Sequence, residues 1–313
     1  MDVFLIGEAM GLFIADDYGD FHNVETFRRG VSGAEMNVAI GLARLGFDIS
    51  YITKLGQDPM GKTIRQLIES ENIHTDHLMI DEDNDTGLQI KNKVRNDDPD
   101  IHYYRKNSAF SHLSKQEVAD IDFSQVRLLH ITGIPLALNE QIRSVVYRLV
   151  ERARMAGTLI TFDPNIREVL WEDKESMIRV LNDMAQYAHV VMPGLSEGQK
   201  LTGLTDPTAI ADFYINQGVE TVIIKDGGNG AYFKQTNKPL EHVAGVSVEK
   251  IVDTVGAGDG FAVGVISGIL DGVSMIESVQ RGNAIGSIQI QHQSDNAALP
   301  NREDLRAYMA SKY

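Results

Sequence analysis

Short apolar runs alternate along the chain with longer stretches in which apolar residues recur at helical spacing. The short runs predict β-strands, and the longer stretches predict α-helices. Strands are predicted at 3–7, 49–54, 128–132, 159–163, 190–192 and 221–226, and helices at stretches that include 34–45, 61–71, 140–156 and 206–217. Strands that alternate with helices are typical of a parallel sheet with helices on both faces, so the pattern predicts an α/β fold.

Two segments interrupt this alternation. Residues 12–27 are polar and aromatic, and residues 86–105 hold apolar residues at alternate positions around the polar turn 96–100. Alternation with a period of two predicts β-ribbons inserted into the α/β body. Two ribbons from distant parts of the sequence can pair into one small sheet, and such a sheet would cover a site at the edge of the body.

Composition narrows the class of protein. The 313 residues carry a formal net charge of −15, and so acidic a chain is a poor non-specific binder of nucleic acid or anionic membranes. There are no cysteines, which excludes disulfides and thiolate metal sites. The first residues resemble a strand rather than a signal peptide, and no apolar run reaches membrane-spanning length. We therefore expect a cytoplasmic protein that binds small molecules.

The most distinctive stretch is 253–261, DTVGAGDGF, which precedes an apolar run at 262–270 that is predicted to be helical. Its glycines let the backbone direct several N–H groups into one concavity, and a helix N-terminus adds partial positive charge. Such a turn suits an anion such as phosphate. The carboxylate of Asp259 would repel phosphate, so its presence in this turn needs a reason. A base that takes a proton from a hydroxyl about to attack phosphorus would be such a reason. The alternative is a glycine-rich turn in which Asp259 only caps the helix.

A second stretch fits another phosphate-binding pattern. Residues 56–63, GQDPMGKT, match G-x-x-x-x-G-K-T and lie between a predicted strand and a predicted helix. Asp58 would place a negative charge inside the phosphate cradle, and Pro59 removes one of its N–H donors. We therefore expect this stretch to be structural.

Two segments offer groups that suit a sugar. In GVSGAEMNVA, residues 30–39, Gly33 lets a ligand approach the backbone, and Asn37 carries both a donor and an acceptor. In HYYRK, residues 102–106, Tyr103 and Arg105 point to one face of a strand and Tyr104 to the other. A turn with a helix cap is the alternative for the first segment.

The arginines favour an acidic sugar. An aromatic ring covers the carbon face of a sugar, and a guanidinium binds a carboxylate through two parallel hydrogen bonds, as Arg105 can beside Tyr103. Arg167 follows a predicted strand, at the edge where α/β sheets bind ligands. The alternative is that each arginine pairs with one of the many surface carboxylates.

Residues 253–261 closely resemble the C-terminal signature of the ribokinase-like, phosphofructokinase-B type carbohydrate kinases, and the resemblance spans the whole chain. It implies one three-layer α/β/α domain over residues 1–313 with a mainly parallel sheet, and a β-sheet lid formed by about 12–32 and 86–108. It also implies that Asp259 is the catalytic base and that the turn formed by Gly256, Ala257 and Gly258 is the anion hole.

The segments GEAM (7–10), YYR (103–105), DPNIREVLW (163–171) and PGLSEG (193–198) are most similar to the members of this family that act on 2-keto-3-deoxygluconate. The resemblance implies substrate contacts at Gly33, Ala34, Asn37, Gln89, Tyr103, Tyr104, Arg105, Arg167 and Asp259. It implies nucleotide contacts at Asn165, Lys225, Gly228, Gly230, Thr254, Gly256, Gly258 and Asn283.

The expected cofactors are ATP and Mg²⁺, because a hard cation neutralises phosphate charge during transfer. Many relatives carry Asn-x-x-Glu, whose glutamate helps to place Mg²⁺ through water; here Gly194 replaces the asparagine, and Glu197 is retained. The family also implies a monovalent cation near Asp253.

The sequence therefore predicts phosphorylation of the terminal hydroxyl of a sugar acid, with 2-keto-3-deoxygluconate as the best candidate and its 6-phosphate as the product. The alternatives are a neutral-sugar kinase of the fructokinase or ribokinase type and a non-catalytic sugar-acid sensor on the same fold. Pairing of lid edges makes a homo-oligomer our expectation.

Overall fold

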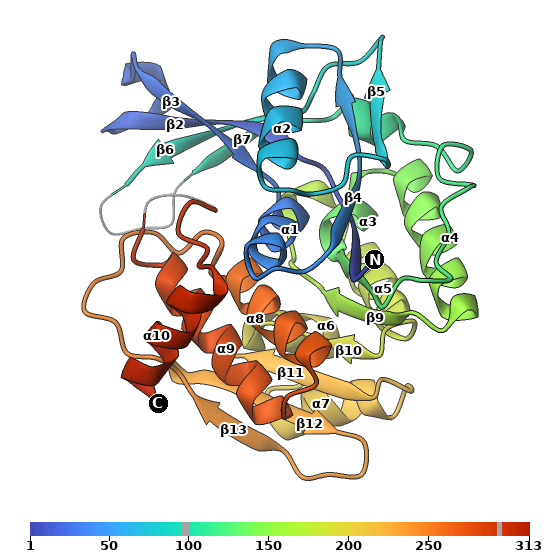
Figure 1. The fold of residues 1–313 in the computed structure, drawn as a ribbon, viewed down its shortest axis with the longest axis vertical. Coiled ribbons are helices and arrows are strands. Elements are labelled where there is room, and N and C mark those ends of the chain that lie inside the picture. The colour runs from blue at the N-terminus through green and yellow to red at the C-terminus, as the bar shows by residue number, and fades with distance from the viewer. Residues whose placement is uncertain (95–99, 293–295) are drawn as a thin grey trace.

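A large sheet runs through the centre of this computed structural model, which describes residues 1–94, 100–292 and 296–313 (Figure 1). Within this part of the chain the sheet has nine strands in the order β13-β12-β11-β10-β9-β8-β1-β4-β5. Neighbouring strands pair in parallel along β5, β4, β1, β8, β9, β10 and β11. Strands β12 and β13 follow at one edge and pair antiparallel. The strands are β1 (Val3–Ile6), β4 (Ile49–Gly56), β5 (Leu78–Asp81), β8 (Leu128–Thr132), β9 (Leu159–Asp163), β10 (Val190–Val191), β11 (Thr221–Lys225), β12 (Gly230–Gln235) and β13 (Glu241–Ala244). All six predicted strands are confirmed.

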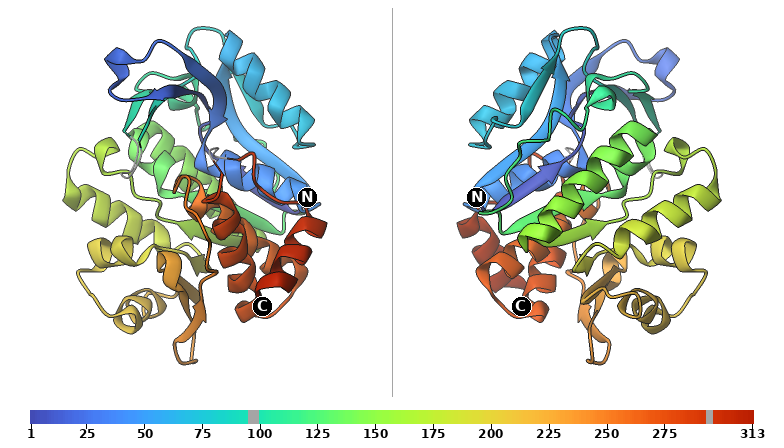
Figure 2. Two further views of the ribbon diagram at one scale, coloured as in Figure 1. Left: turned by 90° about the vertical axis from the view of Figure 1, so that its left-hand side faces the viewer. Right: turned by 90° about the vertical axis from the view of Figure 1, so that its right-hand side faces the viewer.

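Helices cover both faces of this sheet because both faces of its strands are apolar. In β1, Val3 and Leu5 belong to one core, whereas Phe4 and Ile6 belong to the other. Helices α1, α2, α8, α9 and α10 pack on the first face and α3 to α7 on the second (Figure 2). The helices are α1 (Ala34–Arg44), α2 (Pro59–Ser70), α3 (Gly133–Leu138), α4 (Glu140–Ala156), α5 (Lys174–Ala185), α6 (Leu195–Thr202), α7 (Pro207–Ile215), α8 (Ala257–Asp271), α9 (Met275–Gln289) and α10 (Arg302–Lys312). The predicted three-layer arrangement is confirmed.

Four further strands form a small separate sheet, which we call the lid sheet. They are β2 (Met10–Tyr18), β3 (Phe27–Ser32), β6 (Leu88–Lys93) and β7 (Ile101–Tyr104), in the order β3-β2-β6-β7. The pairing between β2 and β6 is parallel, and it joins two ribbons from distant parts of the sequence at one end of the molecule (Figure 1). Most of the polar turn predicted at 96–100 lies outside the described residues.

Residues 56–63 are the end of β4 and the first turn of α2. The Oδ1 atom of Asp58 accepts hydrogen bonds from the backbone N of Met60 (2.8 Å) and Gly61 (2.9 Å). Its Oδ2 atom accepts one from the backbone N of Thr86 at 2.7 Å, just before lid strand β6. The carboxylate thus occupies the helix N-terminus that a phosphate would need, which confirms the structural interpretation of this stretch.

Among the described residues, no helix combines the length and the apolar character needed to cross a bilayer.

The contact between α8 and α9 depends on small residues. A Cβ atom added to Gly264 would lie 2.3 Å from the backbone carbonyl carbon of Arg281 and 2.3 Å from the backbone N of Gly282. Backbone atoms of a packed helix cannot move aside as a flexible side chain can, so the two helices approach each other only because residue 264 has no side chain.

We predict that Gly264→Ala lowers the free energy of unfolding by about 1–3 kcal/mol, because overpacking outweighs the better helix propensity of alanine. Gly30→Ala is the matched control, since its added Cβ would meet only Leu12, at 3.6 Å or more. Urea denaturation measures both variants. Equal midpoints for the two variants would contradict this account of the helix contact.

Candidate active site

A cleft of about 620 Å³ lies between the lid sheet and the carboxyl ends of the central strands. The lid sheet contributes residues such as Gln89 and Tyr103. The body contributes Ile134, Asn165 and Lys225, which lie at or just after the ends of β8, β9 and β11. The α8 N-terminus closes the cleft from a third side, so the predicted sugar-binding and phosphate-binding segments meet in one place.

Asp259 lies in the first turn of α8, where Gly256 is the N-cap with a left-handed φ of 80°. The helix begins at Ala257, five residues before the apolar run that predicted it, because its first turn consists of small residues with no apolar periodicity. Asp259 therefore does not cap the helix, and that alternative is wrong.

The carboxylate of Asp259 is buried and held by two amides. Asn37 Nδ2 donates to Oδ2 at 2.8 Å, and Asn165 Nδ2 donates to Oδ1 at 3.3 Å. Asn37 comes from α1, whereas Asn165 follows β9 with a left-handed φ of 38°. The structure thus brings Asn165, predicted as a nucleotide contact, against the predicted base.

A buried ion pair lies beside this carboxylate. Lys225 Nζ is 2.6 Å from Oδ2 of Asp163 and lines the cleft. Burial opposes the charged form of Lys225, but the carboxylates of Asp163 and Glu197 outweigh it and hold the pKa of this lysine above its usual value. Lys225 is therefore a fixed ammonium at neutral pH, near the α8 turn.

The turn before α1 needs glycine. Gly33 has a φ of 148°, and a Cβ atom added to it would lie 2.7 Å from the backbone oxygen of Glu8. Gly33, Ala34 and Asn37 all line the cleft, as a set of predicted sugar contacts should.

The lid sheet turns one face to the cleft. Gln89 on β6 and Tyr103 on β7 are direct cross-strand partners, and both line the cleft. Gln89 Nε2 donates to Ser32 Oγ at 2.9 Å, which orients its amide. Tyr104 is 57% exposed and stacks on His102 away from the cleft, so the substrate contact predicted for it has no support in this structure.

Arg105 also lines the cleft, but it is paired with a buried carboxylate rather than a surface one. Its Nε and Nη2 atoms lie 2.7 and 2.5 Å from Oε2 of Glu8. The side chains of Arg105 and Glu8 are only 6% and 1% exposed. Within the described part of the chain, Nη1 makes no hydrogen bond, so this edge of the guanidinium remains for a ligand.

Arg167 lies exposed at the cleft, where its Nη1 atom donates to the backbone oxygen of Ile166 at 3.0 Å. No carboxylate among residues 1–94, 100–292 and 296–313 pairs with it; the neighbouring Glu168 pairs with Lys200 instead. The surface-pairing alternative thus finds no support for either arginine.

The predicted nucleotide contacts divide into two groups. Thr254, Gly256 and Gly258 line the cleft. Gly228, Gly230 and Asn283 are not among the residues that line it. Asn283 Nδ2 donates to the backbone oxygens of Val243 and Ala244. A Cβ atom added to Gly230 would lie 2.1 Å from the backbone oxygen of Val243. Gly230 and Asn283 thus contact the end of β13, and contact of all three residues with a nucleotide stays a prediction.

Glu197 closes the N-terminus of α6. Its two carboxylate oxygens accept hydrogen bonds from the backbone N of Gly194 and of Ile166, each at 2.7 Å. Glu197 also lines the cleft, and no group of three or more candidate metal-binding side chains is found in the described ranges. This donor set fits a Mg²⁺ ion held mainly by phosphates and water, with Glu197 as an outer partner.

Comparisons with known proteins identify the family of the chain. The family model described as pfkB family carbohydrate kinase matches residues 1–302. The chain belongs to the pfkB family of carbohydrate kinases.

Several relatives of this kinase are informative. It is 46% identical over its full length, and over 96% of the relative, to 2-dehydro-3-deoxygluconokinase of Bacillus subtilis. It is 30% identical over 91% of the chain and 87% of the relative to 5-dehydro-2-deoxygluconokinase 2 of Bacillus cereus. The family resemblance is confirmed.

Solved structures show the same fold. The crystal structure of the PfkB protein from Polaromonas sp. JS666 has a TM-score of 0.89 and 42% identity, over 98% of this chain and 99% of that one. A fructokinase double mutant from Vibrio cholerae, with fructose, ADP and potassium ion bound, has a TM-score of 0.87 and 25% identity, over 98% of both chains.

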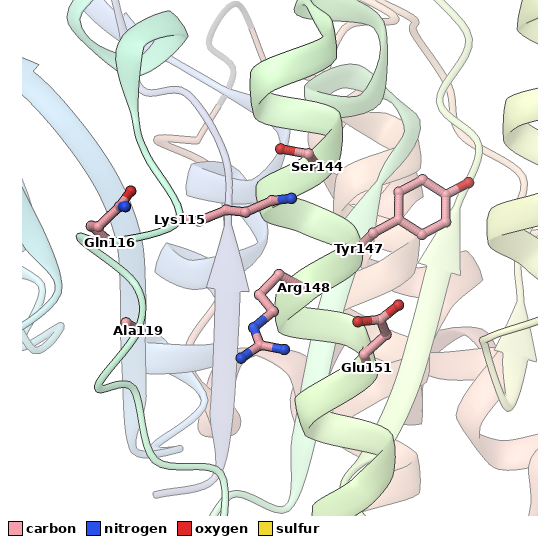
Figure 3. Close-up of a pocket in the computed structure, with 7 residues that line it drawn as sticks. All are labelled: Lys115, Gln116, Ala119, Ser144, Tyr147, Arg148 and Glu151. Carbon is pink, nitrogen blue, oxygen red and sulfur yellow. The ribbon is translucent and has the colours of Figure 1, made fainter.

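The kinase has another cavity of similar size, about 650 Å³, on the outer side of α4 (Figure 3). Helix α4 contributes Ser144, Tyr147, Arg148 and Glu151, and the segment before β8 contributes Lys115. No strand end or glycine turn lines this cavity. Chemistry rather than size therefore makes the cleft at Asp259 the candidate active site.

Sequence reasoning missed a buried acid beside the base. Glu35 is 1% exposed and accepts a hydrogen bond from Thr132 Oγ1. Burial raises the pKa of Glu35 to about 7, and the charge of Asp259 also raises it. The hydrogen bond from Thr132 and the charge of Arg105 lower this pKa but do not outweigh burial. The signal in the sequence was a glutamate between apolar helix positions.

We predict that Glu35→Gln stabilises the kinase at pH 8 by ~3 kcal/mol and has no such effect below pH 4.5. Below pH 4.5 the carboxyl group is protonated in both states. Between pH 4.5 and 7 only the unfolded state ionises, so the penalty of burying Glu35 grows with pH. Denaturant titrations at pH 5 and pH 8 measure the difference, and an equal gain at both values would contradict the assignment.

Proposed function

We propose that this kinase transfers the γ-phosphoryl group of ATP to the terminal hydroxyl of 2-keto-3-deoxygluconate, also called 2-dehydro-3-deoxygluconate, to give the 6-phosphate. The observation that carries the proposal is Arg105, a buried guanidinium on the lid sheet with one edge left for a ligand beside Tyr103. A carboxylate uses this edge far better than a hydroxyl does. The activity named for the Bacillus subtilis relative supports the same substrate.

Different residues of the cleft bind the sugar acid, accept the proton and stabilise the phosphoryl group. Gly33, Asn37, Gln89 and Tyr103 orient the sugar acid, and Arg105 binds its carboxylate. Asp259, held by its two asparagines, accepts the proton as the terminal hydroxyl attacks. The backbone N–H groups at the N-terminus of α8 stabilise the charge on the transferring phosphoryl group, which we expect to be the largest contribution.

Positive charge for the phosphates comes from side chains as well. Lys225 lies near the α8 turn, and Arg167 lines the same cleft. Mg²⁺, when bound, would neutralise charge on the phosphate oxygens, and Glu197 would help to hold it through water.

The two alternatives fit less well. A neutral sugar gains little from Arg105, and a sensor has no use for a buried base at the cleft. We also propose a cytoplasmic homo-oligomer in which lid edges pair, since β3 and β7 are the two edge strands of the lid sheet.

We predict that Asp259→Asn lowers kcat by about 10²–10⁴-fold, the usual contribution of a general base. The amides of Asn37 and Asn165 can turn to satisfy the new side chain, so the cleft keeps its shape. ATP binding, measured by calorimetry, should therefore stay within a few-fold of the parent enzyme. A variant with near-parent turnover would rule out Asp259 as the base.

We predict that Arg105→Met lowers kcat/KM for 2-keto-3-deoxygluconate by about 10–100-fold, which corresponds to the loss of a charge-assisted hydrogen bond. The same variant should lower kcat/KM for fructose much less. The single variant leaves Glu8 buried without its partner, so Glu8→Gln/Arg105→Met is made beside it to separate substrate binding from that imbalance. Arg65→Met, at an arginine that is 52% exposed, is the matched control.

The assay follows ADP release with 2-keto-3-deoxygluconate, 5-dehydro-2-deoxygluconate and fructose. Equal losses for the acids and for fructose in the double variant would show that Arg105 does not select a carboxylate.

A further inference from the structure

A buried ion pair joins the lid sheet to the glycine-rich turn that precedes α8. Lys91 Nζ, on β6, lies 2.5 Å from Oδ2 of Asp253, and the two side chains are only 4% and 10% exposed. A lysine is rarely so buried unless a carboxylate pairs with it. The two residues are 162 positions apart in the sequence, so the contact is a product of the fold.

The carboxylate of Asp253 also shapes the turn. Its Oδ1 atom accepts a hydrogen bond from the backbone N of Val255 at 3.1 Å, one residue before the N-cap Gly256. A carboxylate so close to a phosphate-binding turn would repel the anion. The ammonium of Lys91 cancels that charge while leaving the hydrogen bond to the turn intact.

Lys91 also connects this turn with the sugar side of the cleft. Gln89 and Lys91 are two positions apart on β6 and so share the face turned to the cleft, opposite Tyr103 and Ile101 of β7. The strand that presents the sugar-binding amide therefore also fixes the phosphate-binding turn.

The surroundings of Asp253 do not fit an exchangeable monovalent cation. Such a cation would need the oxygen atoms of Asp253, and the ammonium group already lies at hydrogen-bonding distance from Oδ2. A second cation there would share the one carboxylate of Asp253 with the ammonium of Lys91, and two like charges that close together in a buried place are costly. The fructokinase from Vibrio cholerae was solved with fructose, ADP and potassium ion bound, so a comparison of salts can show whether this kinase differs from it.

We infer that Lys91 is a built-in cation for the phosphate-binding turn and a positioning residue for phosphoryl transfer, and that this kinase works without potassium. The inference rests on the proposed role of the 253–259 turn but not on the identity of the sugar.

The test compares the unmodified full-length enzyme with Lys91→Met in potassium, sodium and tetramethylammonium chloride at one ionic strength. The control is Lys93→Met, on the same strand, where Lys93 Nζ donates to the backbone oxygen of Asp16, away from the turn. Calorimetry gives the Kd of ADP, and ADP release gives kcat and KM.

We expect the unmodified enzyme to vary less than about twofold among the three salts. Lys91→Met should lose at least about tenfold in kcat and in ADP affinity, with a smaller change in KM for the sugar, because its turn no longer holds the anion-binding amides in place. Lys93→Met should behave as the parent.

Two results would overturn the inference: a severalfold activation of the unmodified enzyme by potassium over tetramethylammonium, or parent-like kcat and ADP affinity in Lys91→Met. If Lys91→Met does not fold, the salt series on the unmodified enzyme still decides. Absence of ADP binding in every salt would instead contradict the proposed function.

Discussion

The buried carboxylate of Asp259 is the interaction on which the arrangement of the site depends. Its oxygens bind amides from two separate segments, Asn37 on α1 and Asn165 after β9. Asp259 itself lies in the first turn of α8, so three segments of the chain converge on one carboxylate. A buried carboxylate is costly unless its hydrogen bonds are satisfied, and these two amides supply them without adding charge. These hydrogen bonds hold the carboxylate of Asp259 in place at the N-terminus of α8.

The cleft also needs positive charge in a strongly acidic chain. Three buried ion pairs surround it: Arg105 with Glu8, Lys225 with Asp163, and Lys91 with Asp253. Each pair is close to neutral, and removing one partner of such a pair typically costs about 3–5 kcal/mol. The pairs therefore fix geometry more than they supply net charge. Attraction for the phosphates comes mainly from the N–H groups of α8 and from Arg167, which has no carboxylate partner in the described residues, and the ammonium of Lys225 adds to it despite its pairing with Asp163.

The sequence predicted what local patterns determine. Apolar runs located six strands of the large sheet, β1, β4, β8, β9, β10 and β11, but not β5, β12 or β13, and the glycines of 253–261 located the turn that is predicted to bind phosphate. Asn37 and Arg105 were found because each lies in a short motif. The start of α8 was missed because its first turn carries no apolar residue. Glu8, Lys91 and Asp163 were not predicted, because a pair such as Glu8 and Arg105 joins residues 97 positions apart. Only the strand order of the fold brings such residues together.

The most direct test of the account is a competition among sugars on the unmodified enzyme. ADP release is measured with 2-keto-3-deoxygluconate, 5-dehydro-2-deoxygluconate, fructose and ribose, and phosphorus NMR then locates the phosphate on the product. The account predicts the highest kcat/KM for 2-keto-3-deoxygluconate and a phosphate on its terminal oxygen. Faster turnover of fructose or ribose would contradict it.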